Sequence, residues 1–169
     1  PEAILDEQLF ADVRDLTLDS FPRCDAVVYL AGLSNDVLGD FDEELTLAIN
    51  HRAAVRAAEL ARRRSARAFV YASSCSVYGA AGDAPRTERD DVQPLTAYAR
   101  SKVLAERSLA SLASDSFLVT SLRFGTACGM SERLRLDLVL NDFVAAALSS
   151  GTIRVFGNGA LWRPLIDVQ

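Results

Sequence analysis

The stretch "DAVVYLAG" (residues 25–32) is a continuous apolar run with polar residues on either side. Such a run predicts a strand that is buried on both faces of a sheet. Two later segments, "ARAFVYASS" (66–74) and "FLVTSLRFG" (117–125), have the same character. Helical patterns separate and follow these runs, over 43–64, 96–114 and 135–151.

Strand, helix, strand, helix is the order of βαβ units, whose right-handed crossovers give a parallel sheet with helices on both faces. The sequence therefore predicts an α/β fold with a doubly wound, Rossmann-type parallel sheet. Two short segments, "TIRVFG" (152–157) and "LWRPLIDV" (161–168), are expected to form strands near the end of the chain.

Composition excludes several classes of function. The net charge of −5 argues against a nucleic-acid surface. No apolar run reaches the roughly 18 residues that span a bilayer. Cys24, Cys75 and Cys128 are far apart, so we expect neither a disulfide framework nor a metal site, and a cytoplasmic setting is the default.

Polar and glycine-bearing segments follow each predicted strand. They are "AGLSND" (31–36), "SSCSVYG" (73–79) and "GTACG" (125–129), and the helix from residue 96 begins after the second strand's loop. Because ligands of open α/β sheets bind outside the carboxyl ends of the strands, we expect these segments to surround one site.

Tyr98 and Lys102 lie four positions apart in "YARSK", so they share one face of the helix that Thr96 is expected to cap. A nearby ammonium favours the phenolate form of tyrosine and lowers its pKa. Tyr98 could then take a proton from a substrate hydroxyl that a strand-end serine holds. Loss of hydride from the same carbon needs an acceptor that side chains cannot supply, which implies a nicotinamide cofactor.

The motif order "YASSCSVYG", "YARSK", "LRFGTACG", "WRPLIDV" resembles the extended short-chain dehydrogenase/reductases, and most closely the NAD-dependent nucleotide-sugar epimerases and dehydratases. The resemblance implies that Ser74, Tyr98 and Lys102 are catalytic. It implies that NAD, or alternatively NADP, is the cofactor. The cofactor-binding positions that it implies are Asp12, Val13, Leu30, Ala31, Gly32, Ser73, Tyr98 and Lys102.

The same resemblance implies a nucleotide-sugar substrate. Its implied contacts are Ser74, Ser76, Thr126, Asn141 and Arg163, with Asn50 supporting the site. Thr126 departs from the asparagine that is usual at its position, whereas the Arg163 guanidinium suits a diphosphate.

Two departures from the family pattern carry information. Dehydratases of this group have an acidic pair after the catalytic Ser or Thr, where this chain has Cys75 and Ser76, so water elimination is disfavoured. Cys75 is expected to be a core thiol, with a catalytic thiol as the alternative. The glycine-rich pyrophosphate turn is also missing, so the chain is expected to be a piece of a longer enzyme.

These observations predict a nucleotide-sugar epimerase that uses transient hydride transfer. The alternatives are a keto-sugar reductase or dehydratase of the same family, and a non-catalytic dinucleotide-sensing protein. Residues 1–150 are expected to form the Rossmann domain and 151–169 the start of a substrate lobe. The resemblance further implies a homodimer through helices 43–64 and 96–114.

Overall fold

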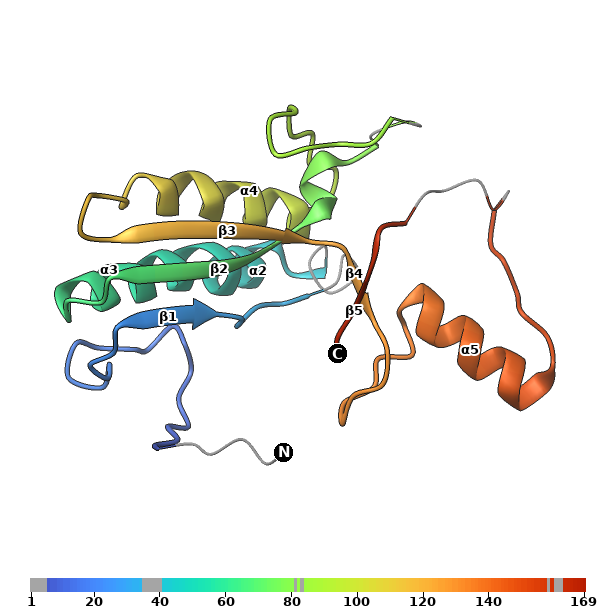
Figure 1. Cartoon of the computed structure of the whole chain (residues 1–169), viewed down its shortest axis with the longest axis horizontal. Helices are drawn as coiled ribbons and strands as arrows, with labels where there is room; N and C mark the ends of the chain where they lie inside the picture. Colours follow the sequence, from blue (N-terminus) through green and yellow to red (C-terminus); the bar gives the residue numbers. More distant parts are fainter. Residues whose placement is uncertain (1–5, 35–40, 81, 83, 158, 160–162) are drawn as a thin grey trace.

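The computed structural model describes residues 6–34, 41–80, 82, 84–157, 159 and 163–169 (Figure 1). The described elements, in chain order, are β1 (Ala26–Tyr29), α2 (Glu43–Leu47), the π-helix η1 (Ala48–Ala53), α3 (Ala54–Arg63), β2 (Ala68–Ser74), the 3₁₀-helix η2 (Cys75–Tyr78), α4 (Ala97–Ala110), β3 (Leu118–Phe124), β4 (Thr126–Cys128), α5 (Val139–Ser150) and β5 (Leu165–Asp167).

The main sheet has the strand order β1-β2-β3, and both pairs are parallel. Ala26 is in register with Ala68, and Ala68 with Leu118. The helices α3 and α4 contact this sheet and lie together on one of its faces (Figure 1). The predicted Rossmann-type parallel sheet is therefore confirmed.

The core lies between this sheet and the helices. Along β2, alternate residues are buried, so that Phe69, Tyr71 and Ser73 face the helix layer. Phe69 and Tyr71 have no exposed surface, and Leu109 of α4 covers them with the same complete burial. Alanines on α3, such as Ala54, allow the helix to approach these large rings closely.

The opposite face of the sheet differs from the expectation of strands buried on both sides. Val28 is 62% exposed, Leu118 65% and Leu122 41%. Leu30, inside the predicted strand, is 71% exposed and lies beyond the end of β1. The reason is that, among the described elements, the helices that contact this sheet pack on its other face.

The helix predicted over 43–64 is one continuous helical run with a π-helical centre. Two tyrosines from the sheet donate hydrogen bonds to backbone carbonyls of this π-helical centre. Tyr29 donates its hydroxyl to the carbonyl oxygen of Ile49 (3.1 Å), and Tyr71 donates to that of Asn50 (2.8 Å). In the wider turns of a π-helix the carbonyls depart from the regular α-helical hydrogen-bond pattern, and these two hydroxyls give such carbonyls a hydrogen-bond donor within the protein.

A second sheet pairs β4 with β5 in parallel. The sequence predicted a strand at the position of β5 but not at that of β4. Part of the expected loop "GTACG" is β4, because Thr126 N–H donates to the carbonyl of Pro164 (2.8 Å) and begins the ladder. The strand predicted at 152–157 is wrong, since these residues form no strand. β5 lies within the predicted 161–168 segment, of which residues 161 and 162 lie outside the described residues.

The helix α5 (Val139–Ser150) begins four residues after the predicted start at 135, and Gly151, whose φ is positive at 66°, caps its end as a glycine stop. It lies beside the second sheet and apart from the first (Figure 1). The division at residue 150 stays a prediction. No helix in the described part of the chain is long and apolar enough to cross a membrane, and the same residues contain no cluster of metal-ligating side chains.

Candidate active site

The helix α4 presents the predicted pair at its first turn. Thr96 is its N-cap, and the Thr96 hydroxyl accepts from the N–H of Ala99 (3.1 Å), as the sequence predicted. Ala97 and Ala99 turn into the core with 1% exposure each. This anchoring leaves Tyr98 half-buried at the start of the helix, on the same face as Lys102.

Lys102 is buried, with 5% exposure. Its ammonium donates to the carbonyl of Ala72 (2.7 Å) and lies 4.8 Å from the ring centre of Tyr71 and 5.6 Å from that of Tyr98. Burial lowers the pKa of Lys102 to about 8, and the negative charge of Glu106 partly opposes this shift. The ammonium therefore titrates much closer to neutral pH than an exposed lysine does.

Lys102 is also the single lysine of the sequence, which has seventeen arginines. Arginine stays charged in proteins, whereas the proton affinity of lysine responds strongly to burial. The one position at which this chain uses lysine is thus a buried position beside a tyrosine.

Asn50 of η1 connects the loop after β1 to α4. Its side-chain oxygen accepts from Leu33 N–H (2.8 Å), and its side-chain nitrogen donates to Leu33 O (3.0 Å) and to the hydroxyl of Ser101 (3.1 Å). A Cβ on Gly32 would come within 2.9 Å of the Asn50 oxygen and 3.6 Å of the Lys102 nitrogen. A side chain at position 32 would force the Asn50 amide to shift, so glycine lets this loop lie against Asn50, near Lys102. The cofactor contact predicted for Gly32 stays a prediction.

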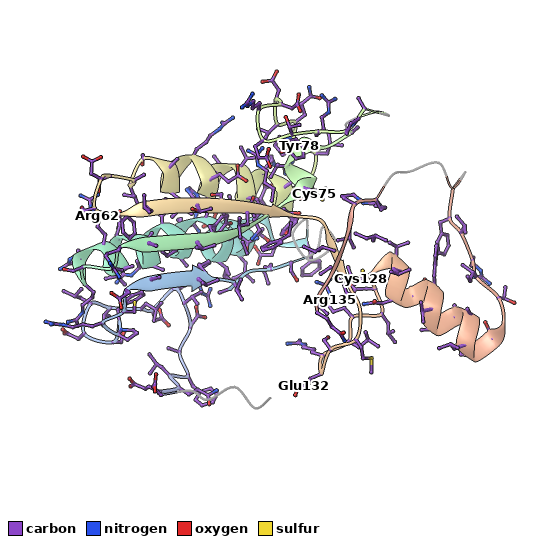
Figure 2. All side chains as sticks on the ribbon, in the orientation of Figure 1. Arg62, Cys75, Tyr78, Cys128, Glu132 and Arg135 are labelled. Carbon is purple, nitrogen blue, oxygen red and sulfur yellow. The ribbon has the colours of Figure 1, made fainter. Side chains whose placement is uncertain are left out.

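The serine-rich end of β2 lies next to the same helix, because α4 packs against both β2 and η2. Ser74 caps η2, and its hydroxyl accepts from the N–H and the hydroxyl of Ser76 at 3.2 and 3.0 Å. Figure 2 shows Cys75 and Tyr78 at this end of the sheet and Arg62, from the basic cluster of residues 61–67, at the other end. The basic cluster is therefore remote from the candidate site.

Cys75 is half-buried, and burial raises the pKa of its thiol above the ordinary value, while the nearby positive charge of Arg163 opposes the shift. The thiol therefore stays protonated near neutral pH, which favours the structural interpretation of Cys75 over the catalytic one. Arg163, which precedes β5, is close enough to Cys75 of η2 for its charge to act there. The substrate contact predicted for Arg163 stays a prediction.

Ser73 is placed differently from Ser74. It faces the helix layer, is 4% exposed, and donates its hydroxyl to Glu106 of α4. Glu106 is also held by Arg123 of β3, with 2.7 Å between Nη2 and Oε2. The cofactor contact predicted for Ser73 stays a prediction, and its hydroxyl already has this internal partner.

Arg135, which no sequence motif singled out, approaches the site from the loop before α5 (Figure 2). Its Nη1 donates to the hydroxyl of Ser34 (2.9 Å), in the loop after β1. The ion pair with Asp137, and to a smaller extent the phenol of Tyr98, raise the pKa of Arg135. A guanidinium therefore lies near the phenol from a loop that the sequence had predicted to be the start of the 135–151 helix.

The remaining predicted residues divide into two groups. Thr126 is half-buried in β4, and Asn141 uses its amide to accept from Gly129 N–H (3.1 Å) and donate to Arg135 O (3.0 Å), so it fixes the loop that carries Arg135. Asp12 and Val13 precede β1. Hydrogen bonds from Arg14 lower the pKa of Asp12 to about 2, and no described hydrogen bond joins this segment to the Tyr98 region.

The chain is similar to known proteins in both sequence and structure. The family model described as "NAD dependent epimerase/dehydratase family" matches residues 6–169. The structure of MoeE5 in complex with UDP-glucose and NAD is 28% identical, has a TM-score of 0.82, and is matched over 94% of this chain and 54% of the other.

Two further similar structures show the shared fold. They are the NAD-dependent NDP-hexosamine 5,6-dehydratase TunA (24% identity, TM-score 0.80, 92% and 51% of the two chains) and the UDP-N-acetylglucosamine 4-epimerase of Methanobrevibacter ruminantium M1 (22%, 0.83, 93% and 52%). The chain thus spans about half the length of the solved structures it matches.

Proposed function

Since the chain belongs to the NAD dependent epimerase/dehydratase family, we propose that it carries the central part of a nucleotide-sugar epimerase that uses NAD. The similarity to MoeE5, a protein solved with UDP-glucose and NAD, supports both the cofactor and the class of substrate. The observation that carries the proposal is the buried Lys102, the chain's single lysine, beside the half-buried Tyr98.

The residues around Lys102 fit a dinucleotide. The backbone of Gly32 lies against the lysine with no side chain between them, and an ammonium has three N–H donors, of which the carbonyl of Ala72 accepts one. We assign Lys102 to the ribose hydroxyls next to the nicotinamide. Leu30, Ala31 and Gly32 would line the cofactor, and Asp12 and Val13 would contact its adenine.

The proton chemistry belongs to three side chains. Tyr98 accepts the proton of the sugar hydroxyl through its phenolate oxygen and returns it after the sugar has presented its other face. Lys102 favours the phenolate by its charge. Ser74, fixed at the end of β2, donates to the sugar oxygen. NAD, when bound, supplies a hydride acceptor.

Epimerisation is preferred over dehydration because of the two residues directly after Ser74. Cys75 and Ser76 provide no carboxylate for the elimination of water, and burial keeps the Cys75 thiol protonated. Arg163 acts on the substrate diphosphate, Thr126 and Ser76 contact the sugar nucleotide, and Asn141 holds the loop near them.

A homodimer through 43–64 and 96–114 is part of the same proposal, and light scattering on the intact protein would test it.

The test of the catalytic assignment is Tyr98→Phe in the intact protein. Losing the proton carrier should lower kcat by about 10²-fold or more while NAD binding is retained. Tyr29→Phe is the matched control, because its hydroxyl contacts only the π-helix in the described structure and its loss should leave turnover near wild-type. Equal turnover in Tyr98→Phe and wild type would overturn the assignment.

A further inference from the structure

A second polar cluster lies behind the Tyr98–Lys102 pair, and the proposed chemistry does not use it. Glu106 is one helical turn after Lys102 on α4. Arg123 of β3 grips its carboxylate with two nitrogens, Nε to Oε1 at 3.0 Å and Nη2 to Oε2 at 2.7 Å. The two side chains are only 20% and 13% exposed, so this is a largely buried, bidentate ion pair.

Arg123 is itself fixed from its other side. Its Nη1 donates to the hydroxyl of Tyr78 (2.9 Å), and its guanidinium carbon lies 5.1 Å from the centre of that ring. The Tyr78 hydroxyl in turn donates to the carbonyl of Thr87 (2.9 Å). A planar fork of five donors can serve both partners at once, which a lysine could not do. Arg123 therefore has one well-defined position relative to Glu106.

The ion pair between Glu106 and Arg123 lies close to Lys102, whose charged neighbours are few. The ammonium makes no ion pair with any acid in the described residues, since it donates to a carbonyl while Glu106 is engaged by Arg123 and Ser73. The titratable and charged groups around Lys102 are Tyr98 and Glu106 on α4, Tyr71 on β2, Arg123 on β3 behind Glu106, and Arg135 beside Tyr98.

We propose that Arg123 is a positioning residue that sets, through its ion pair with Glu106, how much negative charge Lys102 meets and hence how tightly Lys102 holds its proton. The coupling is electrostatic and stands on the geometry of the pair, whereas its value for turnover rests on the proposed function. A Lys102 that held its proton too weakly would no longer favour the Tyr98 phenolate.

The two halves of the pair act on Lys102 with opposite sign. Glu106→Gln removes a negative charge and leaves Arg123, so the pKa of Lys102 should fall by about one unit. Arg123→Gln removes a positive charge and exposes Lys102 to Glu106, so the pKa should rise by a similar amount. The double variant removes both charges and should return the pKa close to its wild-type value.

The measurement is an NMR titration of the Lys102 side chain. The intact protein is labelled with lysine enriched in ¹³C at the ε-carbon, and the Lys102 signal is the one that disappears in Lys102→Arg. Because residues 1–169 contain no other lysine, this region gives one signal. Arg67→Gln is the control, since Arg67 forms an exposed ion pair with Asp25 at the amino end of β2 and should leave the Lys102 titration unchanged.

Opposite shifts in the two single variants, with recovery in the double variant, would establish the coupling. Shifts of the same sign, or no shift in either variant, would overturn it. If the ion pair had a purely structural role, breaking it from either side would loosen the site in the same way and shift the pKa of Lys102 in the same direction. If Arg123→Gln does not fold, the other two variants still test the coupling. The pKa of Lys102 should fall in Glu106→Gln and return close to its wild-type value in the double variant. The titration needs no substrate, so a protein that shows the coupling but no turnover would refute only the proposed function.

Discussion

Asn50 holds Leu33 by both of its backbone groups, accepting from the N–H at 2.8 Å and donating to the carbonyl at 3.0 Å. Its remaining donor reaches Ser101, whose hydroxyl donates to the carbonyl of Tyr98 (2.7 Å). A single buried amide thus fixes the loop after β1 relative to the turn that carries the tyrosine. The position of Gly32 against Lys102 depends on this connection.

Asn50→Ala should therefore destabilise the protein and disturb the site together. It removes a partner from the half-buried backbone groups of Leu33 and from the buried hydroxyl of Ser101, which should lower the free energy of unfolding by about 2–3 kcal/mol. Urea denaturation of the intact protein measures this loss. Asn141→Ala is the comparison, because that amide lies half-buried in the first turn of α5 and its loss should cost less. Equal losses would contradict the role given to Asn50.

Gly79 and Gly82 form a matched pair in the loop before α4, since both have positive φ, at 61° and 66°. A Cβ on Gly79 would lie 2.0 Å from the carbonyl oxygen of Gln93, whereas a Cβ on Gly82 would meet nothing within 4 Å. Gly82→Ala should cost about 1 kcal/mol for its backbone conformation alone. Gly79→Ala should cost clearly more, because the backbone of Gln93 must move. Thermal unfolding of both variants checks the order, and a reversed order would show that the turn is arranged differently.

The buried Lys102 should also give the stability a characteristic pH dependence. Its pKa is about 8 in the folded protein, against 10.5 as the ordinary value. Between these values the unfolded chain binds the extra proton, so the contribution of this group to the free energy of unfolding rises with pH through that window. The full change is on the order of 3 kcal/mol.

Lys102→Met tests this effect, because it removes the titrating group from both the folded and the unfolded protein. The stability of wild type minus that of the variant should be lowest below pH 8 and should grow as the pH rises toward 10.5. Denaturation at a series of pH values gives this difference. A difference that stays constant with pH would mean that Lys102 is not buried as described.

Cys75 and Ser74 are neighbours for which we predict opposite results. Burial raises the pKa of the Cys75 thiol, so Cys75→Ala should leave turnover near wild-type. Ser74→Ala removes the hydroxyl that orients the sugar and should lower kcat by about 10–100-fold. Steady-state assays of the two variants decide between them. A large loss of turnover in Cys75→Ala would instead support a catalytic role for the thiol.

The features that the sequence predicted are those with local causes. The start of α4 follows from Thr96 and the alanines after it, and the parallel sheet follows from apolar runs separated by helical patterns. The π-helical centre of 43–64 was not predicted, and the hydroxyls that bind its carbonyls come from tyrosines on two different strands. β4 likewise needs Pro164 and the residues after it, far along the chain.

The same distinction applies to the site. Tyr98 and Lys102 share one helix, so their spacing alone was informative. Arg135 meets Ser34 across 101 positions and has no motif around it, so only the fold brings it to the tyrosine. Glu106 could have been noticed, because it repeats the four-residue step from Lys102, but its partner Arg123 lies on another strand.

The most direct test of transient hydride transfer is the fate of a deuterium label. Nucleotide sugars such as UDP-glucose, deuterated at the carbon that bears the reacting hydroxyl, are incubated with the intact protein and NAD, and the products are analysed by NMR. We predict a sugar inverted at that carbon that keeps its deuterium, with no net build-up of reduced nicotinamide, and no such product from Tyr98→Phe. An inverted product that had exchanged its deuterium for solvent hydrogen, or no inversion of any nucleotide sugar, would contradict the account.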